Sequence, residues 1–248
     1  MRLQSVASLA SAISVAVAQT TIIPSTCFDS NADMEEYFGY LYPWGSDHNG
    51  AARMAGNSSN HDYINVSTPG TLTLTAKRVD GEPPAGDIEI RYLSGTVYAH
   101  DYLTVEAGSG FDIEAEFRAT TTLGTWPAFW LTAVDSWPPE IDLAEWKGSG
   151  DISFNTFNTS SEVDALDVPY DSSDDFHSVR CELRDVDGST VATTFYLDGE
   201  FVAPQYGNEF VGKPFYLIID LQMEGSSGSP GPEEDTLFEV RGLEVTQI

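Results

Sequence analysis

Residues 111–118 read FDIEAEFR, and this strict alternation decides the fold class. Phe111, Ile113, Ala115 and Phe117 would form one apolar face, while the charged residues between them would form a polar face. Successive side chains of a β-strand point to opposite faces, so we expect this segment to lie with one face on a core and the other in solvent. The segment therefore predicts a strand of a half-buried antiparallel sheet.

The same period of two recurs along the chain, and no stretch shows a convincing long helical period. Gly, Pro, Asn and Asp separate the alternating segments at roughly ten-residue spacing, which is typical of an all-β, two-sheet antiparallel β-sandwich. No linker-like shift in composition divides the chain, so we expect residues 19–248 to form a single domain. Further strands are expected at 71–78, 89–95, 97–105, 191–198 and 213–223.

Residues 137–146, WPPEIDLAEW, place three acids in a strand-like segment framed by tryptophans. Glu140 and Asp142 share one face of a regular strand, whereas Glu145 has the opposite parity. A β-bulge of one residue between Asp142 and Glu145 would restore the parity, and bulges are common beside active sites. We therefore expect Glu140, Asp142 and Glu145 to form a row of carboxyl groups on one surface.

Such a row is suited to sugar chemistry. Glycosidases that retain anomeric configuration use two carboxyl groups about 5 Å apart, one as nucleophile and one as acid/base. Three close acids do not all ionise easily, so we expect at least one to keep its proton and the titrations to be coupled. Since Asp and Glu make up 39 of 248 residues, this spacing alone is expected about once by chance in a solvated acidic face. The framing tryptophans, and the apolar Ile141 and Leu143 between the acids, argue against that alternative.

Tryptophans near the acids are candidates for the floor of a sugar groove. The run TWPAFWL at 125–131 sends Trp126 and Trp130 to one face, and Trp137 stands directly before the acids. Aromatic rings offer large rigid surfaces on which the flat C–H faces of sugars can stack. The alternative is that these tryptophans belong to the core. We expect them to bind a polysaccharide substrate.

Polar side chains elsewhere are weaker candidates for substrate binding. Asn49 and Arg53 would close one end of the groove, from a loop rich in Gly and Ser at 41–58. Asn155 and Asn158 would donate to sugar hydroxyls or simply edge a sheet. His177 is included, although a structural histidine is the commoner case.

The first eighteen residues, MRLQSVASLASAISVAVA, resemble a secretory signal peptide with cleavage after Ala18. A membrane anchor is the competing interpretation, but the apolar run is short and rich in Ser and Ala. No later segment is long and apolar enough to span a bilayer. We therefore expect a secreted, extracellular protein with no membrane partner.

The formal net charge of −28 excludes classes of partner. Nucleic acid requires a basic surface, so nucleic acid is not expected, and polyanionic glycans are disfavoured. A neutral polymer fits better. Cofactors are not expected to be required, since no zinc-like spacing of His and Cys and no Gly-rich phosphate loop is present. We expect a monomer.

Two cysteines, Cys27 and Cys181, are the only ones in the chain. In an exported protein they are expected to form one disulfide, with two free thiols as the alternative. Asn57, Asn65 and Asn158 begin acceptor sequons that would carry glycans in a eukaryotic host.

The combination of GTWPAFWL at 124–131 with WPPEIDLAE at 137–145 resembles the catalytic centre of glycoside hydrolase family 16. YLSGTV at 92–97, FYLDG at 195–199 and PFYLIIDL at 214–221 stand in the family's order, so the resemblance covers about residues 70–245. It implies a concanavalin A-like β-jelly roll. It also implies a structural calcium ion in some members, whose ligands the sequence does not identify.

Carried over to this chain, the resemblance implies that Glu140 is the nucleophile, that Glu145 is the general acid/base and that Asp142 holds and tunes the nucleophile. With its extra residue, Ala144, the chain resembles the bulged branch of the family, which includes laminarinases, agarases and carrageenases. The chain departs from the family at Pro138-Pro139, where a Gly often precedes the first Glu. The loop between the cleft tryptophans and the first Glu is also shorter than is common in the family, and this difference bears on substrate choice more than on chemistry.

We therefore expect an endo-acting retaining glycosidase that cuts a neutral β-linked polysaccharide, with a β-1,3- or β-1,3/1,4-glucan as the leading substrate. A galactan or agar-type polymer is an alternative substrate, and transglycosylation is an alternative reaction. A sugar-binding module without turnover is the alternative from another class. The three-acid row counts against that module, because unpaired carboxyl groups packed together repel one another.

Overall fold

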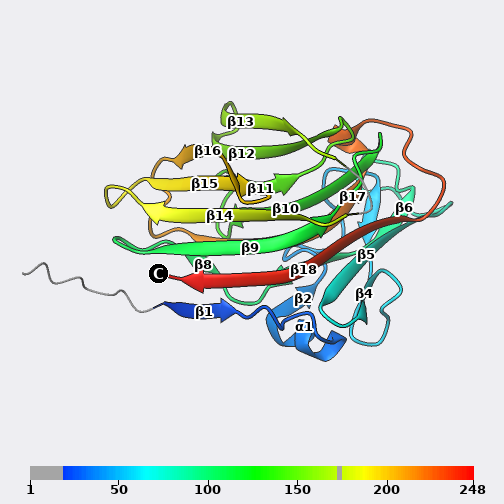
Figure 1. Cartoon of the computed structure of the whole chain (residues 1–248). Helices are drawn as coiled ribbons and strands as arrows, with labels where there is room; N and C mark the ends of the chain where they lie inside the picture. Colours follow the sequence, from blue (N-terminus) through cyan, green and yellow to red (C-terminus); the bar gives the residue numbers. More distant parts are fainter. Residues whose placement is uncertain (1–18, 172–174) are drawn as a thin grey trace, which may run out of the picture.

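A computed structural model describes residues 19–171 and 175–248 of the chain (Figure 1). It confirms the all-β prediction, since the described part is built from eighteen strands, one short α-helix, α1 (Asn31–Tyr37), and a 3₁₀ turn at Gly225–Ser227. The strands form two sheets, largely antiparallel, that pack face to face as a sandwich. None of the described helices is long and apolar enough to cross a membrane. The proposed signal peptide, 1–18, lies outside the described residues.

The first sheet runs across the front of Figure 1 and carries none of the three acids. Its strand order is β16-β15-β14-β9-β18-β5-β6-β3, with β1 paired to β18 and β4 paired to β5. The expected strand at 111–118 is its central member, β9. The bounds are β1 (Thr20–Ile23), β3 (Ala52–Met54), β4 (Ile64–Thr68), β5 (Thr71–Arg78), β6 (Tyr92–Ser94), β9 (Gly110–Arg118), β14 (His177–Asp185), β15 (Val191–Leu197), β16 (Glu200–Gly207) and β18 (Thr236–Gln247).

The second sheet carries the acidic strand. Its order is β13-β12-β11-β10-β17-β7-β2, with β8 paired to β17. Strands far apart in sequence are therefore neighbours, and the tryptophan strand β10 lies between the acidic strand β11 and the late strand β17. The bounds are β2 (Phe38–Tyr40), β7 (Thr96–Ala99), β8 (Leu103–Thr104), β10 (Thr125–Ala133), β11 (Glu140–Glu145), β12 (Asp151–Thr159), β13 (Glu162–Pro169) and β17 (Pro214–Met223).

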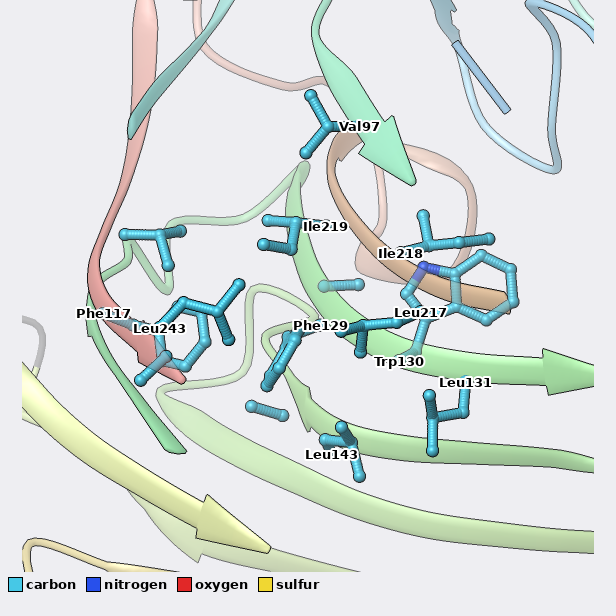
Figure 2. Close-up of a cluster of buried hydrophobic side chains, with 14 of the residues drawn as sticks. Val97, Phe117, Phe129, Trp130, Leu131, Leu143, Leu217, Ile218, Ile219 and Leu243 are labelled. Atoms are coloured by element: carbon cyan, nitrogen blue, oxygen red, sulfur yellow. The ribbon is translucent and has the colours of Figure 1, made fainter. Parts of the chain in front are cut away.

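The core lies between the two sheets. Phe117 of β9 packs against Phe129 of β10, with ring centroids 5.1 Å apart, and Leu143 is fully buried with them (Figure 2). The indole of Trp130 lies beside Ile218 instead, on the other face of its sheet. The alternation of each strand thus separates a core face from a face that is free to build a site.

The predicted disulfide is wrong, because both cysteines are free and buried. The Cys27 thiol contacts the Leu243 carbonyl on β18, whereas the Cys181 thiol contacts the Leu143 carbonyl on β11, each at 3.7 Å. Cys181 therefore points between the sheets while Cys27 is held against a different strand. Burial raises the pKa of Cys27 to about 12 and raises that of Cys181 well above its usual value, so both behave as small core residues.

Candidate active site

The acidic strand contains the expected bulge. Along β12, Asn155 and Ser153 are two residues apart, but their partners on β11, Asp142 and Glu145, are three residues apart. The tryptophan strand records the same extra residue, since one step from Phe129 to Trp130 spans two residues on β11. The bulge therefore brings Glu145 back to the face that carries Glu140 and Asp142.

That face is hollowed into a cavity of about 420 Å³. All three acids line it, although Asp142 and Glu145 are only 5 % and 7 % exposed. The wall combines acids, aromatic rings and amides, which is the chemistry that sugars require. The lining residues are His48, Asn49, Trp126, Ala128, Trp130, Trp137, Glu140, Asp142, Glu145, Asp220 and Gln222.

Glu145 is held by three donors. Trp126 Nε1 donates to its Oε1 at 2.6 Å, while Lys147 Nζ donates to Oε2 at 2.6 Å and Asn155 Nδ2 to Oε2 at 3.2 Å. Although burial lowers the pKa of Lys147, the Glu145 carboxylate raises it overall, so the ammonium stays charged. Three donors from three separate positions fix the orientation of this carboxyl group.

Glu140 and Asp142 have fewer donors. Trp137 Nε1 donates to Glu140 at 2.9 Å, and Asn155 Nδ2 donates to Asp142 at 2.8 Å. Burial is the main reason that the pKa of Glu140 rises to about 7, and repulsion from Glu145 adds to it. Burial, then repulsion from Glu145 and Glu140, raises the pKa of Asp142 well above its usual value. The row therefore holds protons at a pH where ordinary carboxyl groups are ionised.

A fourth acid, Asp220 of β17, lines the cavity on the other side of β10 from the row. Its two oxygens accept from Trp130 Nε1 at 2.7 Å and from the Tyr42 hydroxyl at 2.9 Å. Burial raises the pKa of Asp220 to about 7 in spite of these two donors. Asp220 thereby ties the floor tryptophan to the loop that follows β2.

This loop covers the cavity with aromatic rings. Trp44 stacks on Tyr42 at 5.2 Å, and His48 lies 5.5 Å from Trp130. Burial lowers the pKa of His48 to about 4, so the imidazole is neutral in this setting. The ring cluster is therefore an uncharged wall.

Gln222 attaches the loop to the sheet. Its side chain accepts from the Ala52 N–H at 2.8 Å and donates to the His48 carbonyl at 2.6 Å. A Cβ at position 50 would lie 2.6 Å from Gln222, so only glycine fits there. The amide and Gly50 together hold the loop close over the floor.

Comparisons with known proteins identify this arrangement. The sequence profile of Glycosyl hydrolases family 16 matches residues 56–223, which include the acidic row and the tryptophan strand. The chain belongs to this family. A galactan endo-beta-1,3-galactanase of Flammulina velutipes is 44 % identical over 231 residues, covering 92 % of this chain and 90 % of that protein.

Solved structures show that the family 16 fold is retained at low sequence identity. The endo-1,3-beta-glucanase of Streptomyces sioyaensis aligns with a TM-score of 0.68 and 19 % identity, covering 96 % of this chain and 99 % of that chain. The endo-beta-1,3-glucanase of Pyrococcus furiosus aligns with a TM-score of 0.66 and 18 % identity, covering 86 % and 88 %. These likenesses confirm the jelly-roll fold, and the family membership shows a glycosidase.

The family 16 cavity contains most of the expected residues. Trp126, Trp130 and Trp137 line it, and Trp137 is 55 % exposed. Asn49 is at its rim, and Asn155 holds two of the acids from behind. Trp146, the last residue of the segment WPPEIDLAEW, is fully buried in the core, on the opposite side of the strand from Glu145.

Three expected binding residues lie elsewhere. Arg53 pairs with Asp47 at 2.8 Å and Glu82 at 3.2 Å, away from the cavity lining. Asn158 donates to the Tyr206 carbonyl and accepts from the Asn208 N–H, so it links β12 to β16. Neither side chain lines the cavity, because partners elsewhere in the chain engage both, and their contact with substrate stays a prediction.

His177 is also remote from the cavity. It lies on β14 of the other sheet, where Nδ1 is 2.8 Å from Asp198 and the ring packs 4.9 Å from Tyr170. The core between the sheets separates it from the acids, so His177 does not line this cavity. The structural interpretation, which the sequence left open, is the one that the contacts favour.

Sequence reasoning missed Tyr42, Trp44, Asp220 and Gln222. Asp220 and Gln222 carried a usable signal, since two polar residues of one parity interrupt an otherwise apolar strand, FYLIIDLQM. A one-sided polar pattern in a buried strand indicates a site. The loop residues carried no comparable signal, because their position depends on tertiary packing.

The resemblance to the family also implied that a structural calcium ion could be bound. The described residues contain no group of three or more His, Cys, Asp or Glu side chains placed to hold a metal ion. Side chains of these types therefore do not supply such a site within the described ranges, and no step below depends on calcium.

Proposed function

We propose that this protein is an endo-acting, retaining glycosidase that cleaves the main chain of a β-1,3-linked galactan. The observation that carries the proposal is the bulged row, which brings two glutamates into one cavity beside stacked aromatic rings. The substrate follows from the identity of 44 % to an endo-β-1,3-galactanase along nearly the whole chain.

The chemistry is a double displacement. Glu140 attacks the anomeric carbon as a carboxylate while Glu145, protonated, donates to the leaving oxygen. Water then enters, Glu145 accepts its proton, and the bond to Glu140 breaks to release the sugar with its configuration retained. Among the described residues Glu140 has one side-chain donor, Trp137, which is exposed and can be displaced by an arriving sugar ring.

Asp142 supports this cycle from between the two glutamates. Its buried carboxyl group holds a proton when both neighbours are charged, which limits repulsion in the row. The Asn155 amide contacts both Asp142 and Glu145 and so couples their positions. Asp220 would accept a hydroxyl hydrogen bond from a sugar on the opposite wall.

The charge of the site supports a neutral chain. Four carboxyl groups line the cavity, and no Lys or Arg is among its lining residues within the described chain. Lys147 is not among the lining residues, and its ammonium group is paired with Glu145. Sulfated or uronic polymers would meet uncompensated negative charge here.

The test is cleavage of defined polymers by the purified protein. A β-1,3-galactan is expected to fall rapidly in size, with new reducing ends whose first-formed anomer is β by proton NMR. Glu140→Gln is expected to abolish turnover while its thermal unfolding midpoint stays near that of the parent. Production of the α anomer first, or full activity of Glu140→Gln on the polymer, would refute the mechanism.

A β-1,3-glucan is the second candidate, favoured by the endo-1,3-1,4-beta-glycanase ExsH of Rhizobium meliloti. That protein is 25 % identical over 72 % of this chain, although the match spans only 41 % of ExsH. Laminarin and mixed-linkage glucan tested in parallel would separate the two candidates. Sizing the products also separates hydrolysis from transglycosylation, since only the latter lengthens an oligosaccharide.

A further inference from the structure

Three tyrosines lie on the face of the acidic row but outside its cavity. Thr132 of β10 pairs with Glu140 of β11 on one side and with Tyr216 of β17 on the other. Directly paired residues in an antiparallel sheet point to the same face, so Tyr216 shares the face of Glu140. Asp220, which lines the cavity, has the same parity as Tyr216 along β17 and gives the same answer independently.

The platform continues to the edge of the sheet. Tyr98 of β7 pairs with Ile218 and so lies on the same face, with its ring 6.1 Å from Tyr216. A Cβ at position 39 of β2 would lie 2.6 Å from the Tyr98 ring, so glycine there leaves room for the ring to lie across the strand. Tyr98 and Tyr216 therefore floor the outer part of the sheet.

Tyr102 completes the cluster from the turn between β7 and β8. It packs edge-on against Tyr216 at 5.1 Å and 87°, yet it remains 51 % exposed. It also borders a second hollow, of about 410 Å³, at the end of the sandwich, where Asp101, Thr104 and Glu106 offer hydrogen-bond acceptors and residues of the first sheet form the other wall, namely Ile22, Phe111 and Gln247. A ring held rigidly at one edge and open at its other side, beside acceptors, is suited to a hydroxylated ligand with apolar faces.

We infer that Tyr98, Tyr102 and Tyr216 form a distal sugar-binding platform for the same glycan chain that enters the catalytic cavity. The backbone of Tyr216 lies two strand spacings, about 10 Å, from that of Glu140, which is further than one sugar ring spans. Continuity along one sheet face makes a longer segment of the bound chain the natural occupant. This inference rests on the proposed function, since it assigns the platform to that substrate.

The test compares substrate lengths. The kcat/KM values are measured on β-1,3-galactan and on β-1,3-linked galacto-oligosaccharides from the dimer upward, with the matching glucose series in parallel. For Tyr102→Ala and for Tyr216→Ala, the ratio of kcat/KM on the polymer to that on the dimer is expected to fall about five-fold. Tyr102→Phe retains the ring and is expected to keep the wild-type ratio.

The matched control is Phe201→Ala. Phe201 is 60 % exposed on β16 of the other sheet, so this substitution removes a comparable ring without changing the face that carries the tyrosines. Its ratio is expected to equal that of the wild type. An equal fall in Phe201→Ala, an unchanged ratio in both alanine variants, or an equal fall in Tyr102→Phe would overturn the platform.

A binding measurement separates this inference from the proposed reaction. Glu140→Gln and the double variant Glu140→Gln/Tyr102→Ala are compared by affinity electrophoresis in gels that contain β-1,3-galactan. The double variant is expected to be retarded less. Equal retardation would refute the platform even if catalysis is confirmed, whereas full activity of Glu140→Gln would refute the reaction and leave the binding comparison to stand by itself.

Discussion

The ammonium group of Lys147 lies 2.6 Å from Oε2 of Glu145, the residue proposed to donate the proton. It is the cation of the acidic row among the described residues, since the groups that interact electrostatically with Glu145 from the rest of the cavity, Glu140, Asp142 and Asp220, are all acids. Lys147 is 30 % exposed, so it can leave Glu145 when substrate arrives. The pair therefore sets the charge of the resting site.

Removal of this cation is expected to shift the pH profile. Lys147 lowers the pKa of Glu140, so Lys147→Met raises that pKa further and moves the acidic limb of kcat/KM to higher pH, by about one pH unit. Lys147→Arg should keep the wild-type limb. Lys213→Met is the matched control, because Lys213 contacts only the distant Phe210 ring among the pairs that the structure records. An unshifted limb in Lys147→Met would mean that the ion pair has no part in tuning the nucleophile.

The wild-type profile has a predicted direction of its own. Because burial raises the pKa of Glu140 to about 7, and the nucleophile must be ionised, kcat/KM is expected to fall as pH drops through a range well above the ordinary glutamate value of about 4. Initial rates at low substrate concentration across pH give this limb directly. Because kcat/KM reports groups of the free enzyme, an acidic limb near the ordinary value would contradict the raised pKa of Glu140.

Glu145→Gln is expected to separate the two chemical steps. The amide cannot donate a proton, so kcat on the polymer should fall by about 100-fold or more. A substrate with a dinitrophenyl leaving group needs no proton donor and should still form the glycosyl-enzyme in a burst. Loss of the burst together with the polymer activity would place Glu145 in a different role.

Asp220→Asn tests the buried acid on the far wall through stability. The folded pKa of about 7 exceeds the unfolded value of about 4, so the folded state binds more protons and wild-type stability falls as pH rises through this window. Asparagine keeps both contacts, by accepting from Trp130 and donating to Tyr42, and removes the titration. Thermal unfolding midpoints should therefore depend less on pH in Asp220→Asn than in the parent.

Asp187→Asn is the comparison for that experiment. Backbone N–H groups of Thr190 and Ser189 lower the pKa of Asp187, so its carboxyl group is charged in both states across the window. The unfolding midpoint of Asp187→Asn should therefore depend on pH as steeply as that of the parent. Equal slopes for Asp220→Asn and the parent would contradict the buried titration.

The two free cysteines predict how the protein responds to a reducing agent. The unfolding midpoint is expected to be the same with and without reducing agent, and two thiols per chain should react with a thiol reagent only after unfolding. A lower unfolding midpoint in the presence of reducing agent would indicate that the two cysteines form a disulfide after all.

Much of the fold was available from local pattern. The alternation in FDIEAEFR predicted strand β9 and its two faces, since parity is a local property. The bulge was predictable for the same reason, because Glu145 had the wrong parity for a regular strand. Trp126 and Trp130 followed from the alternation of their own strand.

The remaining features depend on which strands become neighbours. Asp220 reaches the site because β17 pairs with β10, although 90 residues separate it from Trp130. The Cys181 thiol contacts the Leu143 carbonyl of β11, 38 residues away, rather than Cys27. Partners of this kind are set by long-range packing, which no spacing in the sequence encodes.

Ala144 is an extra residue that the strand absorbs without moving its chemistry. Without that codon no bulge would be needed, because Glu145 would then share the parity of Glu140 and Asp142 in a regular strand, and the following indole would keep its side in the core. One residue and one bulge thus compensate each other, so lineages with and without the insertion can present the same three acids to the sugar. The insertion can therefore be gained or lost in a single step, and it marks a change of strand geometry rather than of chemistry.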